Sequence, residues 1–127
     1  CASEVYVAGL SQPKRDAIRA VFNLDCVAGS AKFGAMISKF PILATIVEAA
    51  AKTQGADVQV FEPLLKNSDH YNFSIIGVPA MRLIAGFGDE NSRLRNVLTE
   101  ADTREMVLED EMLAALGLTL GMVDAAI

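Results

Sequence analysis

The sequence contains only one histidine and two cysteines, and it lacks a long hydrophobic run. A single histidine excludes a paired His-x-x-x-His metal motif, and two cysteines exclude both a disulfide framework and a zinc knuckle. Each apolar run is interrupted by Asp, Glu, Lys or Arg before it reaches the roughly 20 residues that cross a bilayer. We therefore expect no membrane partner.

Basic residues are also few, with 11 Lys and Arg against 16 Asp and Glu and a net charge of -5. They are scattered, whereas proteins that hold a phosphate backbone cluster them, so we expect no nucleic-acid partner. The hydrophobic content of 52% suffices for a core, and residues 1–127 have the length of a single domain. Because the chain has neither an initial methionine nor a signal-like segment, we expect a processed or truncated part of a longer polypeptide and assign no compartment.

The hydrophobic pattern predicts strands alternating with helices. Strands are expected at residues 18–24, 57–61 and 79–85, helices at 41–54 and 104–127, and one or two helical turns at 71–76. Residues 2–10 fit either a helix or a strand. This order of elements predicts an α/β fold, with a three-layer αβα arrangement around a small, mostly parallel sheet.

Three strands would make a very small sheet, and the predicted strands are strongly apolar. Such strands normally lie inside a larger sheet with both faces covered, so an isolated copy would leave hydrophobic edges open. We expect additional strands from an N-terminal half of the protein or from another copy of the chain, as in a homo-oligomer.

The last predicted helix carries apolar residues along one face. Its members are Leu113, Leu116, Leu120 and Val123. Gly117 and Gly121 are expected to weaken this helix, because glycine is a poor helix former. The acidic residues 109–111 are expected to be solvated in its first turns.

Asp25 is the first candidate site residue, because it follows a predicted apolar strand. A carboxylate at the carboxyl end of a strand can reach into a cleft at that edge of the sheet. On local grounds, a turn or helix cap is an equally good interpretation of Asp25.

Asp69 and His70 form the second candidate, in a polar turn that precedes another predicted strand. The carboxylate can fix the tautomer of the imidazole, or His70 can bind a metal with Asp69 as its hydrogen-bond partner. The structural alternative is that Asp69 caps the helical turn that follows. Neither a Gly-x-Ser-x-Gly motif nor a Gly-x-Gly-x-x-Gly motif is present, which argues against a serine hydrolase and a nucleotide-binding loop.

Several short motifs occur in a fixed order along the chain. They are Asn23-Leu24-Asp25 with Gly29 soon after, then Ser68-Asp69-His70, Phe73, Gly77-Val78-Pro79-Ala80, and finally Leu98-Thr99-Glu100-Ala101-Asp102-Thr103. In this order and spacing they resemble the C-terminal portion of the di-zinc aminopeptidase family, which also includes the glutaminyl cyclases.

The resemblance implies a zinc-dependent hydrolase that cleaves N-terminal peptide bonds, with zinc as cofactor and a peptide as substrate. It implies that Asp25 ligates one zinc and that Asp69 supports the hydrogen bonds of the active site. Residues 2–10 resemble the helix that follows the family's Glu-Glu pair, so the general base and the other ligands are expected upstream. We therefore expect this chain to be inactive by itself.

One departure from the family pattern lies at Leu98, where the resemblance places a zinc-ligating histidine. A hydrocarbon side chain cannot bind zinc, which takes N, O or S ligands and usually at least three from the protein. We expect weak zinc binding, with His70 as a substrate contact or a substitute ligand, and we assign no role to Asn67 or Arg82. The alternative is a non-catalytic interaction or assembly module with a degenerate metal site.

Overall fold

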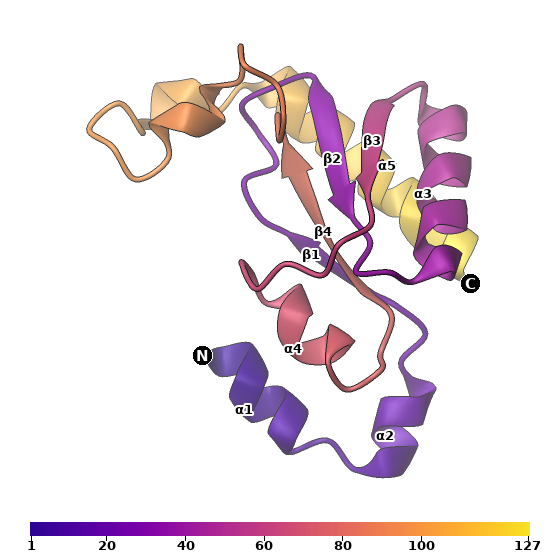
Figure 1. Cartoon of the computed structure of the whole chain (residues 1–127). Helices are drawn as coiled ribbons and strands as arrows, with labels where there is room; N and C mark the ends of the chain where they lie inside the picture. Colours follow the sequence, from indigo (N-terminus) through magenta and orange to yellow (C-terminus); the bar gives the residue numbers. More distant parts are fainter.

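A four-stranded sheet lies at the centre of the structure (Figure 1), a computed structural model that describes all 127 residues. The strands are β1 (Val21–Leu24), β2 (Lys32–Met36), β3 (Asp57–Phe61) and β4 (Ala80–Ala85). The α-helices are α1 (Ala2–Ala8), α2 (Gln12–Ala17), α3 (Pro41–Gln54), α4 (His70–Ser74) and α5 (Glu109–Ala126). Two short 3-10 helices, η1 (Arg93–Asn96) and η2 (Arg104–Met106), separate β4 from α5. None of these helices has the length and hydrophobicity needed to cross a membrane.

The strands are ordered β1-β4-β2-β3 across the sheet, so that β1 and β3 are its edges. β1 runs parallel to β4 and β3 runs parallel to β2, whereas β2 and β4 are antiparallel. The predicted α/β fold with a mostly parallel sheet is therefore confirmed. The strands expected at 18–24, 57–61 and 79–85 correspond to β1, β3 and β4.

The sequence pattern does not reveal β2, which has the sequence Lys-Phe-Gly-Ala-Met. Glycine and alanine are depleted in strands, and the segment has no β-branched residue. Gly34 has a packing reason, because a Cβ there would lie 3.1 Å from the Phe61 ring and 3.2 Å from Phe87 Cβ. The two rings pack edge to face with centroids 4.9 Å apart. The glycine thus makes room for an aromatic pair beside the strand.

The central strand β4 is buried at all six of its positions, including the charged Arg82. Successive side chains of a strand point to opposite faces, so both faces of the sheet are covered here. A cluster of 13 buried hydrophobic residues joins the sheet to α3 and α5, which pack against each other. The helix α4 packs against β1 and β4, and α1 packs against α4 (Figure 1).

The helix predicted at residues 41–54 is confirmed as α3, with the ends that the sequence predicts. Pro41 occupies the first turn, where the N–H that proline lacks would have no partner within the helix. Gly55 ends the helix with a left-handed φ of 64°, which costs glycine little. One side of the helix is buried, at Leu43, Ile46, Val47 and Ala50.

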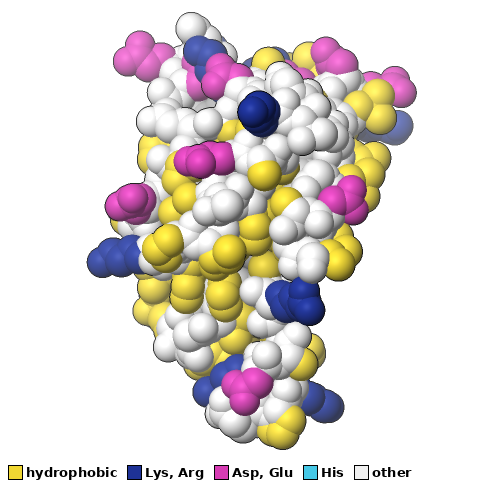
Figure 2. Space-filling model, turned by 90° about the vertical axis from the view of Figure 1, so that its right-hand side faces the viewer, with side chains coloured by type: hydrophobic (Ala, Val, Ile, Leu, Met, Phe, Trp, Pro, Cys, Tyr) yellow, Lys and Arg dark blue, Asp and Glu magenta, His cyan; other side chains and the backbone are white.

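The helix α5 does not bury the apolar face that the sequence shows. Its buried residues are Glu111, Ala115, Leu118 and Met122. The four residues of that apolar face, Leu113, Leu116, Leu120 and Val123, are between 41% and 59% exposed. Apolar residues lie all around this helix, so their spacing does not select one side. Apolar side chains also lie among charged ones on the face that carries α3 (Figure 2).

Close approach to α3 explains which side of α5 is buried. A Cβ at Gly121 would lie 3.2 Å from Ala50 Cβ, and a Cβ at Gly117 would lie 2.9 Å from the side-chain oxygen of Gln54. The glycines that were expected to weaken α5 therefore form its contact surface with α3. Small residues on both helices allow the two backbones to come close together.

Glu111 corrects the expectation that residues 109–111 are all solvated, because it is buried. Its carboxylate accepts a hydrogen bond from the backbone N–H of Gly29 at 2.9 Å and pairs with the guanidinium of Arg93. A buried carboxylate needs such partners to offset its lost hydration. These contacts tie the first turn of α5 to the loop before β2 and to η1.

Replacing Gly121 by leucine is expected to lower the free energy of unfolding by about 1–3 kcal/mol, because the new side chain would overlap with Ala50. Urea unfolding followed by circular dichroism measures the change. The matched control is Asp124→Ala on the exposed side of the same helix, with an expected change below about 0.5 kcal/mol. Equal effects of the two substitutions would contradict this packing.

Candidate active site

Asp25 lies directly after β1, beside the central strand β4. Its backbone N–H donates to the carbonyl of Leu83 at 3.2 Å, and the N–H of Ala85 donates to the carbonyl of Cys26 at 2.8 Å. Pairing with β4 therefore continues past β1, and Cys26 has a φ of 59°, which is uncommon outside glycine. The Asp25 side chain is 39% exposed, at the carboxyl end of the strand.

Two donors converge on the same oxygen of Asp25. Oδ2 accepts a hydrogen bond from the Ser68 hydroxyl at 2.7 Å and lies 3.1 Å from Nη2 of Arg82. Ser68 in turn accepts from the Asn23 side-chain amide at 2.6 Å, and Nη1 of Arg82 donates to the carbonyl of Asn67 at 3.5 Å. Because the Arg82 side chain is only 10% exposed, solvent screens its ion pair with Asp25 weakly on that side.

Cys26 also contacts the carboxylate, with its Sγ 3.5 Å from Oδ1 of Asp25. Burial and the neighbouring negative charge of Asp25 both raise the pKa of the Cys26 thiol. A thiol with a raised pKa stays protonated at neutral pH. Cys26 is therefore neither a ready nucleophile nor a ready thiolate ligand.

The hydrogen bonds of Asp69 lead to α1 and not to Asp25. Its Oδ1 accepts from the Ser3 hydroxyl and from Sγ of Cys1, the latter at 3.4 Å. Asn72 donates to the same Ser3 hydroxyl at 2.8 Å, so both ends of the segment 69–72 are tied to α1. The Asp69 side chain makes no capping hydrogen bond to α4. Its expected part in the hydrogen bonds of an active site stays a prediction.

His70 is completely buried at the start of α4, with 0% of its surface exposed. Neither ring nitrogen has a hydrogen-bond partner. Burial and repulsion from the Arg82 guanidinium lower the pKa of the imidazole, so the ring is neutral at pH 7. A role as a substrate contact or substitute ligand stays a prediction, and it would require the ring to become accessible.

Asp25 and Asp69 line one open cleft with a volume of about 430 Å³. The other lining residues are Cys1, Glu4, Lys66, Asn67, Ser68, Tyr71 and Asn72. The Lys66 ammonium lies 5.6 Å from the centre of the Tyr71 ring, within the range of a cation–π contact. The structure thus brings two of the three predicted site residues to one cleft, whereas His70 does not line it.

The residues of this chain do not by themselves fit a zinc ion. No group of three His, Cys, Asp or Glu side chains lies close enough together to hold a metal. Structural and catalytic zinc sites usually have at least three protein ligands. Moreover, Oδ2 of Asp25 is already engaged by Arg82 and Ser68. A metal at Asp25 would need further donors from outside these residues.

The segment 98–103 forms a turn of its own. The N–H of Leu98 donates to Oδ2 of Asp102 at 3.1 Å, and Leu98 has a φ of 63°. The Leu98 side chain is 95% exposed, and the segment does not line the Asp25 cleft. The position at which the resemblance places a zinc-ligating histidine therefore has no contact with the cleft in this structure.

Arg82 is the main residue of the site that the sequence pattern leaves without a role. The signal for it is a single charged residue in the middle of a strand whose other members are apolar. Since a buried charge requires a partner, this pattern predicts a carboxylate nearby. The sheet register then supplies the missing information, because it places Arg82 opposite Asn23, two residues before Asp25.

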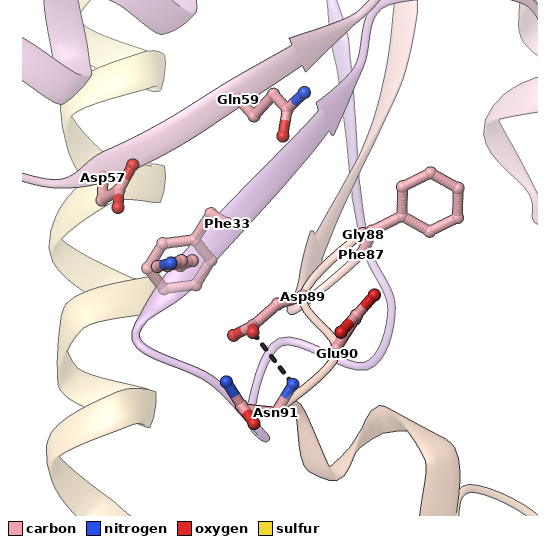
Figure 3. A pocket seen from close by; sticks show the side chains of 9 residues that line it. Phe33, Asp57, Gln59, Phe87, Gly88, Asp89, Glu90 and Asn91 are labelled. Atoms are coloured by element: carbon pink, nitrogen blue, oxygen red, sulfur yellow. Dashed lines mark hydrogen bonds between the residues drawn. The ribbon is translucent and has the colours of Figure 1, made fainter.

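A second cavity, of about 310 Å³, lies where β2 and β3 begin (Figure 3). Asp57 and Gln59 come from β3, and Asp89 and Glu90 come from the loop after β4. The backbone N–H of Asn91 donates to Oδ1 of Asp89 at 3.1 Å, which the dashed line marks. None of its lining residues belongs to the family-like motifs, so we place the candidate site at the Asp25 cleft.

The sequence pattern of the peptidase family M28 matches residues 1–118. The chain belongs to peptidase family M28. The resemblance drawn from the sequence motifs is therefore confirmed at the level of the family. No curated protein matches the sequence at a significant level.

Solved structures with the same fold include two aminopeptidases and a glutaminyl cyclase. The zinc aminopeptidase of Bacillus subtilis has a TM-score of 0.86 and 21% identity, over 98% of this chain and 32% of that one. The aminopeptidase of Aneurinibacillus sp. strain AM-1 has a TM-score of 0.78 and 20% identity, over 96% and 29%. The glutaminyl cyclase of an Acidobacteriales bacterium has a TM-score of 0.75 and 20% identity, over 98% and 44%. This M28 chain thus spans less than half the length of each relative.

The buried, neutral His70 of this M28 chain predicts a loss of stability on acidification. Below the ordinary pKa of 6.5 the unfolded state binds a proton, whereas the folded state, with its lowered pKa, does not. The free energy of unfolding should therefore fall below pH 6.5, with a slope approaching about 1.4 kcal/mol per pH unit from this group.

Urea unfolding at several pH values between 7.5 and about 5 measures this slope. His70→Gln is expected to flatten it, because glutamine does not titrate and all other ionisable groups are unchanged. The slope is compared and not the absolute stability, since glutamine also changes the packing around α4. Identical slopes for the two proteins would show that His70 is protonated equally in the folded and unfolded states.

Proposed function

We propose that residues 1–127 form part of a zinc-dependent M28 hydrolase that cleaves N-terminal peptide bonds. The observation that carries the proposal is an M28 fold in which Asp25, at the carboxyl end of β1, opens onto a cleft shared with Asp69. A carboxylate at this edge of an α/β sheet is well placed for substrate or metal contact.

The assignment of roles follows the motifs of the sequence. Asp25 is the side chain that we assign to metal ligation, Asp69 to the hydrogen-bond network that supports the active site, and His70 to substrate contact or substitute ligation. The remaining ligands and the general base would come from residues outside 1–127, and the same part of the protein would supply strands next to β1 or β3. The small share of each relative that the chain spans supports this division.

The chain alone is expected to be inactive, because its donor set is too small to hold zinc. Purified residues 1–127 with added zinc chloride should release no p-nitroaniline from leucine p-nitroanilide. The longer protein that contains them should cleave this substrate, and Asp25→Ala there should lower kcat/KM by about 100-fold or more.

The matched control for this assay is Glu48→Gln on the exposed side of α3, away from the cleft, which should leave kcat/KM unchanged. Chelation by EDTA should abolish cleavage, and zinc should restore it. Wild-type activity of the Asp25→Ala protein would refute metal ligation by Asp25, and metal-independent cleavage would refute the proposed reaction.

A non-catalytic assembly module is the second candidate function. It is favoured by the outward apolar side of α5, formed by Leu113, Leu116, Leu120 and Val123. Contiguous apolar surface of this kind marks interaction sites, and the edge strands β1 and β3 offer unpaired backbone groups. We propose another copy of the chain, or an N-terminal half of the same protein, as the partner.

Sedimentation equilibrium should show a mass that increases with concentration if copies of the chain associate. Leu116→Glu and Leu120→Glu should lower that mass, because each places a charge in the apolar side of α5. Glu109→Gln at the exposed start of the same helix is the control and should have no effect. A monomer at all concentrations would refute self-association through α5.

A further inference from the structure

We infer that the guanidinium of Arg82 holds the place of a metal ion at Asp25, so that Arg82 and a divalent cation compete for one carboxylate. The inference rests on the proposed role of Asp25. It goes beyond that role because it names a residue of this chain that controls access of metal to the site.

The first support is that the guanidinium engages the carboxylate directly. Nη2 of Arg82 lies 3.1 Å from Oδ2 of Asp25, and Nη1 donates to the carbonyl of Asn67 at 3.5 Å. The planar guanidinium is thus held from two sides, by β1's end and by the turn before α4. Arginine forms strong charge-assisted hydrogen bonds with carboxylates and cannot be deprotonated in proteins.

The second support is the position of Arg82 in the fold. It belongs to the central strand β4, every residue of which is buried, and its side chain is 10% exposed. Its Nε is buried without a hydrogen-bond partner. If the pair with Asp25 were broken, Arg82 would remain a buried charge without a counter-ion, which is costly. This favours a permanent pair over a surface contact that opens readily.

The third support is the lack of other compensating groups for either charge. No second carboxylate contacts Arg82, and no other cationic side chain pairs with Asp25. The nearest other candidate carboxylate, Asp69, is engaged with Ser3 and Cys1. Each member of the pair is therefore the counter-ion of the other, as a bound cation would be for Asp25 alone.

Competition follows from the shared oxygen. A cation bound at Oδ2 would meet the positive guanidinium in a partly buried site, where like charges repel strongly. Ser68 already occupies a further acceptor direction of the same oxygen. Metal binding at Asp25 therefore requires the Arg82–Asp25 ion pair to break, and the free-energy cost of breaking it lowers the affinity for the metal.

Equilibrium dialysis against zinc chloride, with metal content measured in the retained protein, tests the competition in the longer protein that contains residues 1–127 and would supply the remaining ligands. Arg82→Met removes the guanidinium and keeps an apolar stem of similar length. It should raise zinc affinity at least tenfold over the wild type. Asp25→Asn in the Arg82→Met background should abolish the gain, and Arg93→Met, which removes the arginine of the other side-chain ion pair, should leave zinc affinity at the wild-type level.

Two results would overturn the inference. One is a folded Arg82→Met chain with unchanged zinc affinity, and the other is an unmodified chain that already binds zinc through Asp25 as tightly as the variant. Should Arg82→Met fail to fold, Arg82→Lys offers the second test. It keeps the charge, so its zinc affinity should stay low, and a rise would refute the role of the charge.

A measurement on the unmodified chain complements the variants. In a zinc titration followed by NMR, any zinc that binds Asp25 should shift the side-chain N–H signals of Arg82, because the guanidinium has to move. Asp25-dependent binding without a change at Arg82 would refute competition. Metal content and these signals report on Arg82, whereas cleavage by the longer protein reports on the proposed hydrolase, so the two proposals can fail separately.

Discussion

Burial of an arginine in the central strand is the constraint on which both the sheet and the candidate site depend. The strand β4 pairs with β1 on one side and β2 on the other, and all its residues are buried. A charge in such a strand needs a counter-ion and hydrogen bonds. Asp25 and the carbonyl of Asn67 provide them. In doing so they fix the end of β1 and the turn before α4 against the same strand.

Elements with one clear period and recognisable ends could be predicted from the sequence, and α3 is the best case. Its buried side repeats at helical spacing, and Pro41 and Gly55 mark its ends by their own backbone preferences. The strand β2 and the inward side of α5 could not be predicted in this way. Gly34 is required by two phenylalanines from other strands and loops, and Gly121 by a residue on another helix. Where the local sequence pattern is weak, contacts between distant segments therefore determine the structure.

The residues of the candidate site that lie in recognisable sequence motifs could be predicted from the sequence. Asp25 and Asp69 were candidates from their positions after a predicted strand and in a polar turn, and the resemblance gave them their expected roles. The structure places both on one cleft. The pairing of Arg82 depends on sheet register, which no local pattern contains. The burial of His70 was hidden for a related reason, because polar neighbours in the sequence do not show that the ring at the start of α4 is completely buried. Whether the side chains of a polar turn are accessible to a substrate therefore depends on tertiary packing, which the local sequence does not show.

The Arg82–Asp25 pair has a consequence for how sequences of this kind can change. Loss of Arg82 alone leaves Asp25 without its counter-charge, and a histidine gained alone at position 98 would sit in an exposed turn that does not reach the cleft. Neither single substitution by itself completes a site with three metal ligands. Conversion of this charge-paired cleft into an ion-binding one would therefore need coordinated substitutions on two separate segments.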